Sequence, residues 1–190
     1  MVITYQGGES FKLSQGDLAV LINPKTSSRS KAEVTLYSSA YPLEESKDSF
    51  VINGPGEYEI KDIFIKGFLS EGANKKINTI YLISFEGMNL CFLGALANPD
   101  LSTETLEAIE DVDILFVPAG DGETLSPSAA YKLAVSLEPS VIIPMHYTDA
   151  TLKQFLKEGE EVKIEPLNKL VVKKKDLDGK EGEIIILKEE

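Results

Sequence analysis

NTIYLISFEGMNLCFLG, residues 78–94, is the stretch that decides how this chain folds. Two apolar runs, Thr79–Phe85 and Asn89–Leu93, are separated by Glu86-Gly87-Met88. A short connection that contains glycine between two such runs is typical of a β-hairpin. The segment therefore predicts two antiparallel strands joined by a tight turn.

The sequence before this hairpin predicts further strands. Short apolar or alternating runs of three to five residues, punctuated by Gly, Pro, Asn and Asp, are typical of strands and too short for helices. They lie at Val2–Tyr5, Phe11–Leu13, Leu18–Ile22, Val34–Tyr37, Phe50–Ile52, Tyr58–Ile60 and Ile63–Ile65. The glycine-rich segment Asn53–Tyr58 has no helix after it that could hold a phosphate, so it is interpreted as a turn between strands.

The sequence after the hairpin alternates between helix and strand. Ser102 and Ser126 are candidate helix N-caps, and Pro127 stands at the first position of the second helix. A third helix is expected from about Ala150 to Lys157. The strands expected between and after the helices are Asp113–Val117, Val141–Ile143, Leu170–Val172 and Ile184–Leu187, with residues 173–183 joining the last two as a hairpin would. Strands that alternate with helices imply parallel pairing, so the chain is predicted to be an α/β sandwich with mixed sheets.

Composition limits the classes of function. The chain has 190 residues and a net charge of −12, from 19 Lys and Arg against 31 Asp and Glu. One domain, residues 1–190, is the expectation at this length. The negative charge disfavours nucleic acid and anionic membranes as partners, and neither a membrane-spanning run nor a signal peptide is evident. A single cysteine, Cys91, permits no disulfide within the chain and is interpreted as a core residue, so the protein is expected to be an acidic cytoplasmic protein.

Candidate catalytic groups are expected in the loops that follow the carboxyl ends of the strands. These loops hold His146, the only histidine, together with Asp121, Glu123, Glu71 and Asp149. One histidine and one cysteine cannot supply a conventional zinc site. The favoured interpretation of His146 is therefore a partly buried side chain bonded to a loop carbonyl or carboxylate. It would act as a ligand only if several carboxylates converged on it.

Four segments carry a resemblance to a known family. GPGEYE at residues 54–59, the hairpin at 78–94, VDILFVPAG at 112–120 and IPMHYT at 143–148 occur in this order and spacing in proteins of the metallo-β-lactamase fold. The chain most resembles the branch of lactonase-like Zn-dependent hydrolases. This resemblance implies a four-layer αββα sandwich of two mixed β-sheets. It also implies a site where two divalent ions activate a hydroxide.

The positions that carry metal ligands in that family are mostly occupied here by residues that cannot bind a metal. The resemblance places Ser38, Ala40, Pro42 and Leu43 at the positions of the H-x-H-x-D-H loop, and Ala95 at that of the bridging aspartate. Near the position of a further histidine only Glu71 could coordinate, and the last histidine survives as His146. The expectation is therefore that binuclear zinc catalysis is lost and that no cofactor is needed.

Three interpretations of function stay open. The favoured one is a non-catalytic pseudoenzyme that serves as a binding or assembly domain. The second is a hydrolase with a rebuilt site, in which His146, Asp121, Asp149, Glu71 or Glu123 surrounds one divalent cation or His146 acts as a general base. The third is a homo-oligomer, or a sensor that holds a small uncharged molecule in the vacated cleft.

Overall fold

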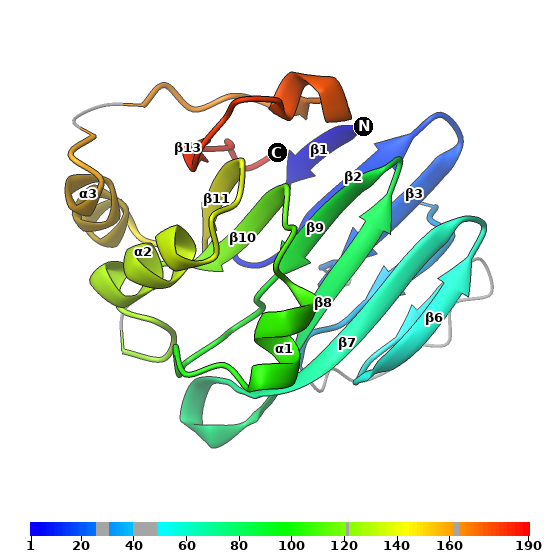
Figure 1. Ribbon diagram of the computed structural model, residues 1–190, viewed down its shortest axis with the longest axis horizontal. Coiled ribbons are helices and arrows are strands. Elements are labelled where there is room, and N and C mark those ends of the chain that lie inside the picture. Colours follow the sequence, from blue (N-terminus) through cyan, green and yellow to red (C-terminus); the bar gives the residue numbers. More distant parts are fainter. Residues whose placement is uncertain (26–30, 40–48, 121, 162–163) are drawn as a thin grey trace.

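Two β-sheets packed face to face form the body of the protein (Figure 1). The computed structural model describes residues 1–25, 31–39, 49–120, 122–161 and 164–190. The six-stranded sheet has the order β12-β1-β2-β3-β4-β5. Its strands are β1 (Val2–Tyr5), β2 (Phe11–Gln15), β3 (Leu18–Ile22), β4 (Val34–Leu36), β5 (Phe50–Ile52) and β12 (Leu170–Val171).

The second sheet has seven strands in the order β13-β11-β10-β9-β8-β7-β6. They are β6 (Gly56–Ile60), β7 (Ile63–Glu71), β8 (Ile77–Phe85), β9 (Met88–Phe92), β10 (Ile114–Pro118), β11 (Val141–Met145) and β13 (Glu183–Ile184). The expected hairpin is β8–β9, with Phe85 paired to Met88 across the turn. Strands β9, β10, β11 and β13 run parallel, whereas β6 to β9 are antiparallel.

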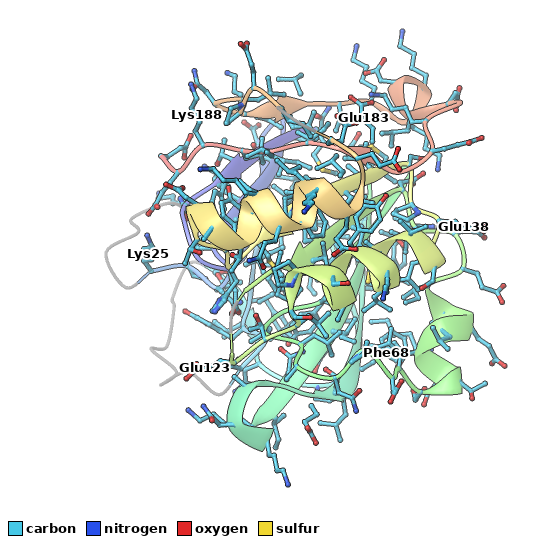
Figure 2. The ribbon with its side chains drawn as sticks, turned by 90° about the vertical axis from the view of Figure 1, so that its left-hand side faces the viewer. Lys25, Phe68, Glu123, Glu138, Glu183 and Lys188 are labelled. Carbon is cyan, nitrogen blue, oxygen red and sulfur yellow. The ribbon has the colours of Figure 1, made fainter. Side chains whose placement is uncertain are left out.

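Helices connect the parallel strands, as the alternating sequence predicts. They are α1 (Thr103–Ala108), α2 (Pro127–Ser136) and α3 (Asp149–Glu158), with short 3₁₀ turns η1 (Ala73–Lys75) and η2 (Lys174–Leu177). Ser102 and Ser126 are the N-caps of α1 and α2, each accepting a hydrogen bond from a backbone N–H of the first turn. Figure 2 shows α2 and α3 side by side over the seven-stranded sheet, where the rings of Tyr131 and Phe155 lie 5.7 Å apart between centroids. None of the helices in the described ranges is long and apolar enough to span a bilayer.

The alternation of side chains along β9 divides the core into two layers. Leu90 and Phe92 face the six-stranded sheet, whereas Cys91 and Leu93 face the helices. Phe92 meets Phe11 and Phe116 between the sheets, with ring centroids 6.2 and 6.0 Å away. Cys91 is fully buried, as predicted, and burial raises the pKa of its thiol to about 12. This cysteine is a core residue.

The predicted two-sheet α/β fold is confirmed, but the prediction of a C-terminal hairpin is wrong. β12 pairs antiparallel with β1 in the six-stranded sheet, whereas β13 pairs parallel with β11 in the seven-stranded sheet. The intervening segment contains η2 and passes from one sheet to the other. Lys174 of η2 is bonded to the buried carboxylate of Asp113 at 2.7 and 2.8 Å, which holds this connection against the start of β10. Each final strand therefore extends an existing sheet.

Candidate functional site

The candidate site lies where the carboxyl end of β11 meets the β1–β2 loop. His146 directly follows β11 and has a left-handed backbone with φ of 52°. Its N–H donates to the carbonyl oxygen of Gly8 at 2.9 Å, so the loop from the six-stranded sheet is tied to the end of the seven-stranded sheet. A left-handed non-glycine residue is uncommon and is retained when surrounding contacts impose it. Here the bond to Gly8 and the contacts of the imidazole impose it.

Glu9 is the direct partner of His146. Nδ1 of the imidazole lies 2.9 Å from Oε1 of Glu9, and the His146 side chain is 39% exposed while that of Glu9 is only 12% exposed. The hydrogen bond to Glu9 raises the pKa of His146, and the charges of Glu9 and Glu123 raise it further, against a smaller lowering by burial. The pair is therefore held with Nδ1 of His146 as the donor to the Glu9 carboxylate.

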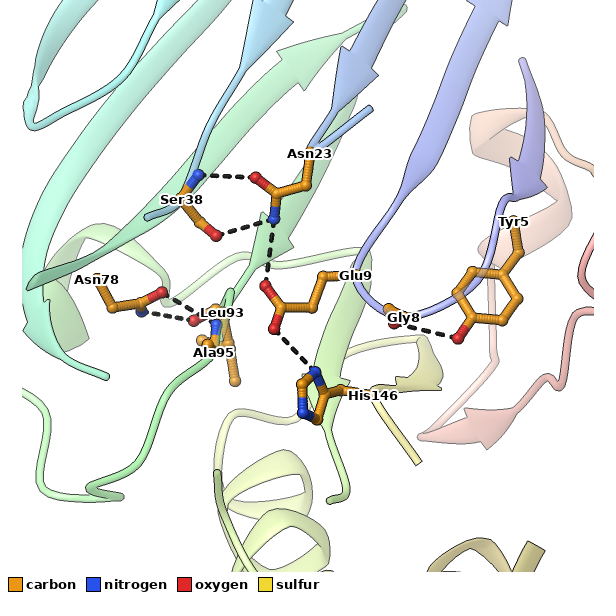
Figure 3. A network of polar contacts seen from close by, with 9 residues as sticks. All are labelled: Tyr5, Gly8, Glu9, Asn23, Ser38, Asn78, Leu93, Ala95 and His146. Carbon is orange, nitrogen blue, oxygen red and sulfur yellow. Dashed lines mark hydrogen bonds and ion pairs between the residues drawn. The ribbon is translucent and has the colours of Figure 1, made fainter. Parts of the chain in front are cut away.

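The same carboxylate continues into a chain of neutral polar groups (Figure 3). Nδ2 of Asn23 donates to Oε2 of Glu9 at 3.2 Å and to Oγ of Ser38 at 2.9 Å. The backbone N–H of Ser38 returns a bond to Oδ1 of Asn23 at 2.9 Å. Ser38, Asn23, Glu9 and His146 thus form one continuous polar network, which we call the Glu9 network.

Asn78 organises the neighbouring strand ends. Its Nδ2 donates to the carbonyl of Leu93 at 2.9 Å and to Oγ of Ser70 at 2.8 Å, while its Oδ1 accepts from the N–H of Ala95 at 3.0 Å. Gly94 stands between this amide and Ser38: a Cβ at this residue would lie 2.3 Å from Oδ1 of Asn78 and 2.8 Å from Cβ of Ser38. A side chain is therefore excluded from position 94.

Gly120, after β10, is equally crowded beside His146. A Cβ there would lie 2.3 Å from Oγ1 of Thr124 and 3.0 Å from Cδ2 of His146. The Thr124 hydroxyl is buried, and within the described residues it has no hydrogen-bond partner. The loops after β10 and β11 are thus packed closely around the imidazole.

The structure brings some of the predicted site residues together and separates others. Ser38 and Ala95 lie in the same region as His146, at the joined strand ends (Figure 3). Glu71, Glu123 and Asp149 are exposed: Glu71 ends β7, Asp149 begins α3, and Glu123 accepts a hydrogen bond of 3.4 Å from Asn74 while lying near enough to His146 for its charge to raise the pKa of the imidazole. The remaining predicted positions, Ala40, Pro42, Leu43 and Asp121, lie outside the described residues.

The donor set that is described does not fit a binuclear metal centre. Over the part of the chain that the structure describes, no three His, Cys, Asp or Glu side chains are grouped so that they could hold a metal ion. Glu9 already bonds to His146 and Asn23, and the other members of its network are neutral amide and hydroxyl groups. A hydroxide-generating zinc pair needs imidazole and carboxylate ligands that face the ions. Nδ1 of His146 is already bonded to Glu9, so Nε2 is its other ring nitrogen that could bind a metal.

Sequence reasoning did not identify Glu9, Asn23 or Asn78 as members of the site. Glu9 belongs to a loop between two strands of the other sheet, and only the packing of the sheets brings it to His146. The interpretation of His146 as a partly buried side chain bonded to a loop carbonyl or carboxylate agrees with its contact to Glu9, but that partner was not named. The one local signal is the Gly7-Gly8 pair, in which both residues have positive φ and turn the chain toward His146.

Comparisons with known proteins agree with this architecture. Residues 2–146 match the family model described as a β-lactamase superfamily domain. A UPF0173 metal-dependent hydrolase of Deinococcus radiodurans is 35% identical over 77 residues, which cover 40% of this chain and only 33% of that protein. The match therefore spans about a third of that relative's length.

Solved structures extend the similarity over the whole chain. A protein from Thermotoga maritima assigned to the Zn-dependent hydrolases of the metallo-β-lactamase superfamily has a TM-score of 0.81 and 26% identity, covering 98% of this chain and 97% of its own. The metallo-β-lactamase-fold protein YhfI of Bacillus subtilis has a TM-score of 0.69 and 10% identity over 98% and 95% of the two chains, a likeness of fold alone. By its family match, its two-sheet architecture and these structural relatives, the chain belongs to the metallo-β-lactamase superfamily.

Proposed function

We propose that this chain is a non-catalytic member of the superfamily, a pseudoenzyme whose domain serves binding or assembly. The observation that carries this proposal is the Glu9 network. Its one carboxylate is already engaged by an amide and an imidazole, and its amide and hydroxyl groups bond to one another. Polar groups that satisfy one another at the joined strand ends stabilise the loops, and they do not generate a hydroxide. The superfamily's scaffold is then used for a different purpose.

Metal analysis together with an activity panel tests this proposal. The purified chain would be incubated with zinc and with manganese, dialysed, and analysed for metal by mass spectrometry. Lactone, phosphodiester and thioester substrates would then be assayed, with the Thermotoga maritima relative as a parallel control. We expect well below one ion per chain and no turnover above the rate in buffer. An ion bound in stoichiometric amount, whose chelation abolishes a measured hydrolysis, would overturn the proposal.

A second candidate is a hydrolase that works through His146, either around one divalent cation or as a general base. Its support is the orientation of the imidazole: Nδ1 is held by a carboxylate, and the side chain is 39% exposed. The same carboxylate–histidine arrangement orients metal ligands and general bases in other proteins. If a cation binds here, Nε2 of His146 would be its nitrogen ligand, and the cation would supply Lewis-acid chemistry at this rim.

Substitution of His146 separates the two candidates. Under the second, His146→Ala abolishes hydrolysis of a panel substrate, while Glu9→Gln lowers the rate and changes its pH profile. Lys153→Ala, which changes an exposed residue of α3, would leave the rate unchanged and serves as the matched control. A hydrolysis that survives His146→Ala in folded protein rejects this mechanism.

The partner in a binding role is proposed to be either a protein, including a second copy of the chain, or a small uncharged molecule at the vacated site. Light scattering tests self-assembly by measuring the mass in solution. Thermal-shift calorimetry with a panel of metabolites tests binding of a small molecule. A monomer whose Tm no metabolite changes would reject both self-assembly and the sensor.

A further inference from the structure

Strand β6 is the edge of the seven-stranded sheet, and its outer side is open within the described residues. The β6–β7 hairpin turns through Lys61 and Asp62, which have φ of 49° and 63°, and it pairs Ile60 with Ile63 next to the turn. In a two-residue hairpin this first pair is hydrogen bonded, and bonded pairs then alternate with non-bonded ones. The N–H and C=O groups of Glu57 and Glu59 therefore point away from β7. Among the described residues these groups have no backbone partner.

A groove of about 410 Å³ lies beside this edge, on the face of the sheet that carries the helices farther along. Two cross-strand rows line it: Glu57, Lys66 and Leu82, and then Glu59, Phe64 and Ser84. Phe68 and Ile80, the next outward-facing pair along β7 and β8, are buried in the same cluster as the helices. Figure 1 shows β6 at the margin of the sheet, away from the helices. Phe64 remains 49% exposed in the groove. The open strand edge therefore lies beside a groove of mixed character, in which Leu82 and Phe64 are flanked by charged and polar side chains.

The charges on β6 decide which kind of strand can occupy this edge. Glu57 lies 3.1 Å from Nζ of Lys66, whereas Glu59 forms no ion pair within the described part of the chain. Antiparallel pairing of β6 with β6 of a second copy would place glutamate opposite glutamate, which is destabilising. A strand that carries Lys or Arg at alternate positions would instead place cations beside Glu57 and Glu59. The two glutamates therefore disfavour self-pairing and favour a basic partner.

We infer that the β6 edge is a docking site for an extended, basic segment of a partner protein, which adds to the sheet as a further strand. Backbone bonds to Glu57 and Glu59 supply affinity, and the alternate side chains supply specificity through the two carboxylates and the exposed ring of Phe64. This docking site is far along the sheet from His146, so the inference holds whether or not the His146 site is active.

The test uses the full chain and a blocked hexapeptide of alternating lysine and valine. We expect saturable binding by calorimetry and slower hydrogen exchange at the amides of Glu57 and Glu59. The double variant Glu57→Gln/Glu59→Gln should weaken binding about three- to tenfold. Glu104→Gln/Glu107→Gln on α1 removes the same charge elsewhere and should leave the affinity unchanged. Equal weakening by both double variants, or no binding at all, would overturn the inference.

Two further variants test the backbone contact. Glu59→Pro removes an outward N–H but none of the ladder bonds to β7, so it should abolish peptide binding with little change in Tm. Should this variant unfold, the wild-type chain with a peptide N-methylated at alternate positions tests the same bonds, and that peptide should not bind. Binding that tolerates the methyl groups, or exchange protection confined to another strand, contradicts docking at the β6 edge.

Discussion

His146 is the one histidine of the chain, so its imidazole signals in a proton NMR titration need no assignment. Because the bond to Glu9 raises its pKa above the ordinary 6.5, protonation of His146 stabilises the folded state. That contribution is complete below pH 6.5 and is lost as the pH rises through the folded-state pKa. We expect Tm to fall over this interval in the wild type and the fall to be much smaller in Glu9→Gln.

The matched comparison for this prediction is Glu123→Gln. Glu123 affects His146 only through its charge, so this variant should lower the pKa of the imidazole less than Glu9→Gln does. The measurements are the NMR titration and Tm from pH 5.5 to 8.5. A His146 pKa that does not change on Glu9→Gln would show that the 2.9 Å contact contributes nothing to the proton equilibrium.

Gly94 and Gly87 allow a measurement of how tightly the strand ends are packed. Both have positive φ, +62° and +72°, but a Cβ on Gly94 would meet Asn78 and Ser38, whereas a Cβ on Gly87 would meet no atom within 4 Å. Gly87→Ala should cost about 1–2 kcal/mol in the free energy of unfolding, from backbone conformation alone. Gly94→Ala should cost a further 1–3 kcal/mol or so through overpacking, as urea denaturation would measure. Equal losses would refute the crowding.

At the scale of elements, Asn78 ties three strand ends together. Asn78→Ala would leave the N–H of Ala95 and the carbonyl of Leu93 without their side-chain partners in a buried setting. We expect a loss of about 2–4 kcal/mol in the free energy of unfolding. Asn89→Ala, on the same hairpin, is the control: its side chain donates to the carbonyl of Asp111 at 3.2 Å and accepts from Oγ of Ser84 at 2.8 Å, outside the buried strand ends, and its loss should cost about 1 kcal/mol. Similar losses in both variants would contradict the role given to Asn78.

Local patterns predicted most of the elements because they depend on neighbours in the sequence. The β8–β9 hairpin follows from two apolar runs around Gly87, and α2 follows from Ser126 and Pro127. The two C-terminal strands were predicted, but their pairing was wrong for a physical reason: two apolar runs separated by a polar segment fit a crossing between sheets as well as they fit a hairpin. The bonds from Lys174 to Asp113, which favour the crossing, join residues far apart in the chain.

At the scale of the whole molecule, the sequence indicated the scaffold but not the polar network at the joined strand ends. His146 and Ser38 were named individually, yet the residues between them, Glu9 and Asn23, come from two different loops of the six-stranded sheet. No periodicity or spacing in the sequence marks the carboxylate of Glu9 or the amide of Asn23 as part of a site. The packing of the two sheets creates the Glu9 network, and that is a tertiary property.

The net charge of −12 makes a prediction about the entire fold. Excess negative charge destabilises a compact state by self-repulsion, and salt screens this repulsion. Raising the ionic strength from about 0.02 to about 0.2 M should therefore raise Tm by roughly 2–4 °C, the shift expected for about 1 kcal/mol at this chain length. Sodium chloride and choline chloride should act alike, since screening does not depend on the cation. A Tm that is insensitive to both salts would contradict self-repulsion. A larger rise in Tm caused by micromolar zinc or manganese, and lost in His146→Ala, would instead reveal a specific cation at the Glu9 network. That result would favour the hydrolase over the pseudoenzyme.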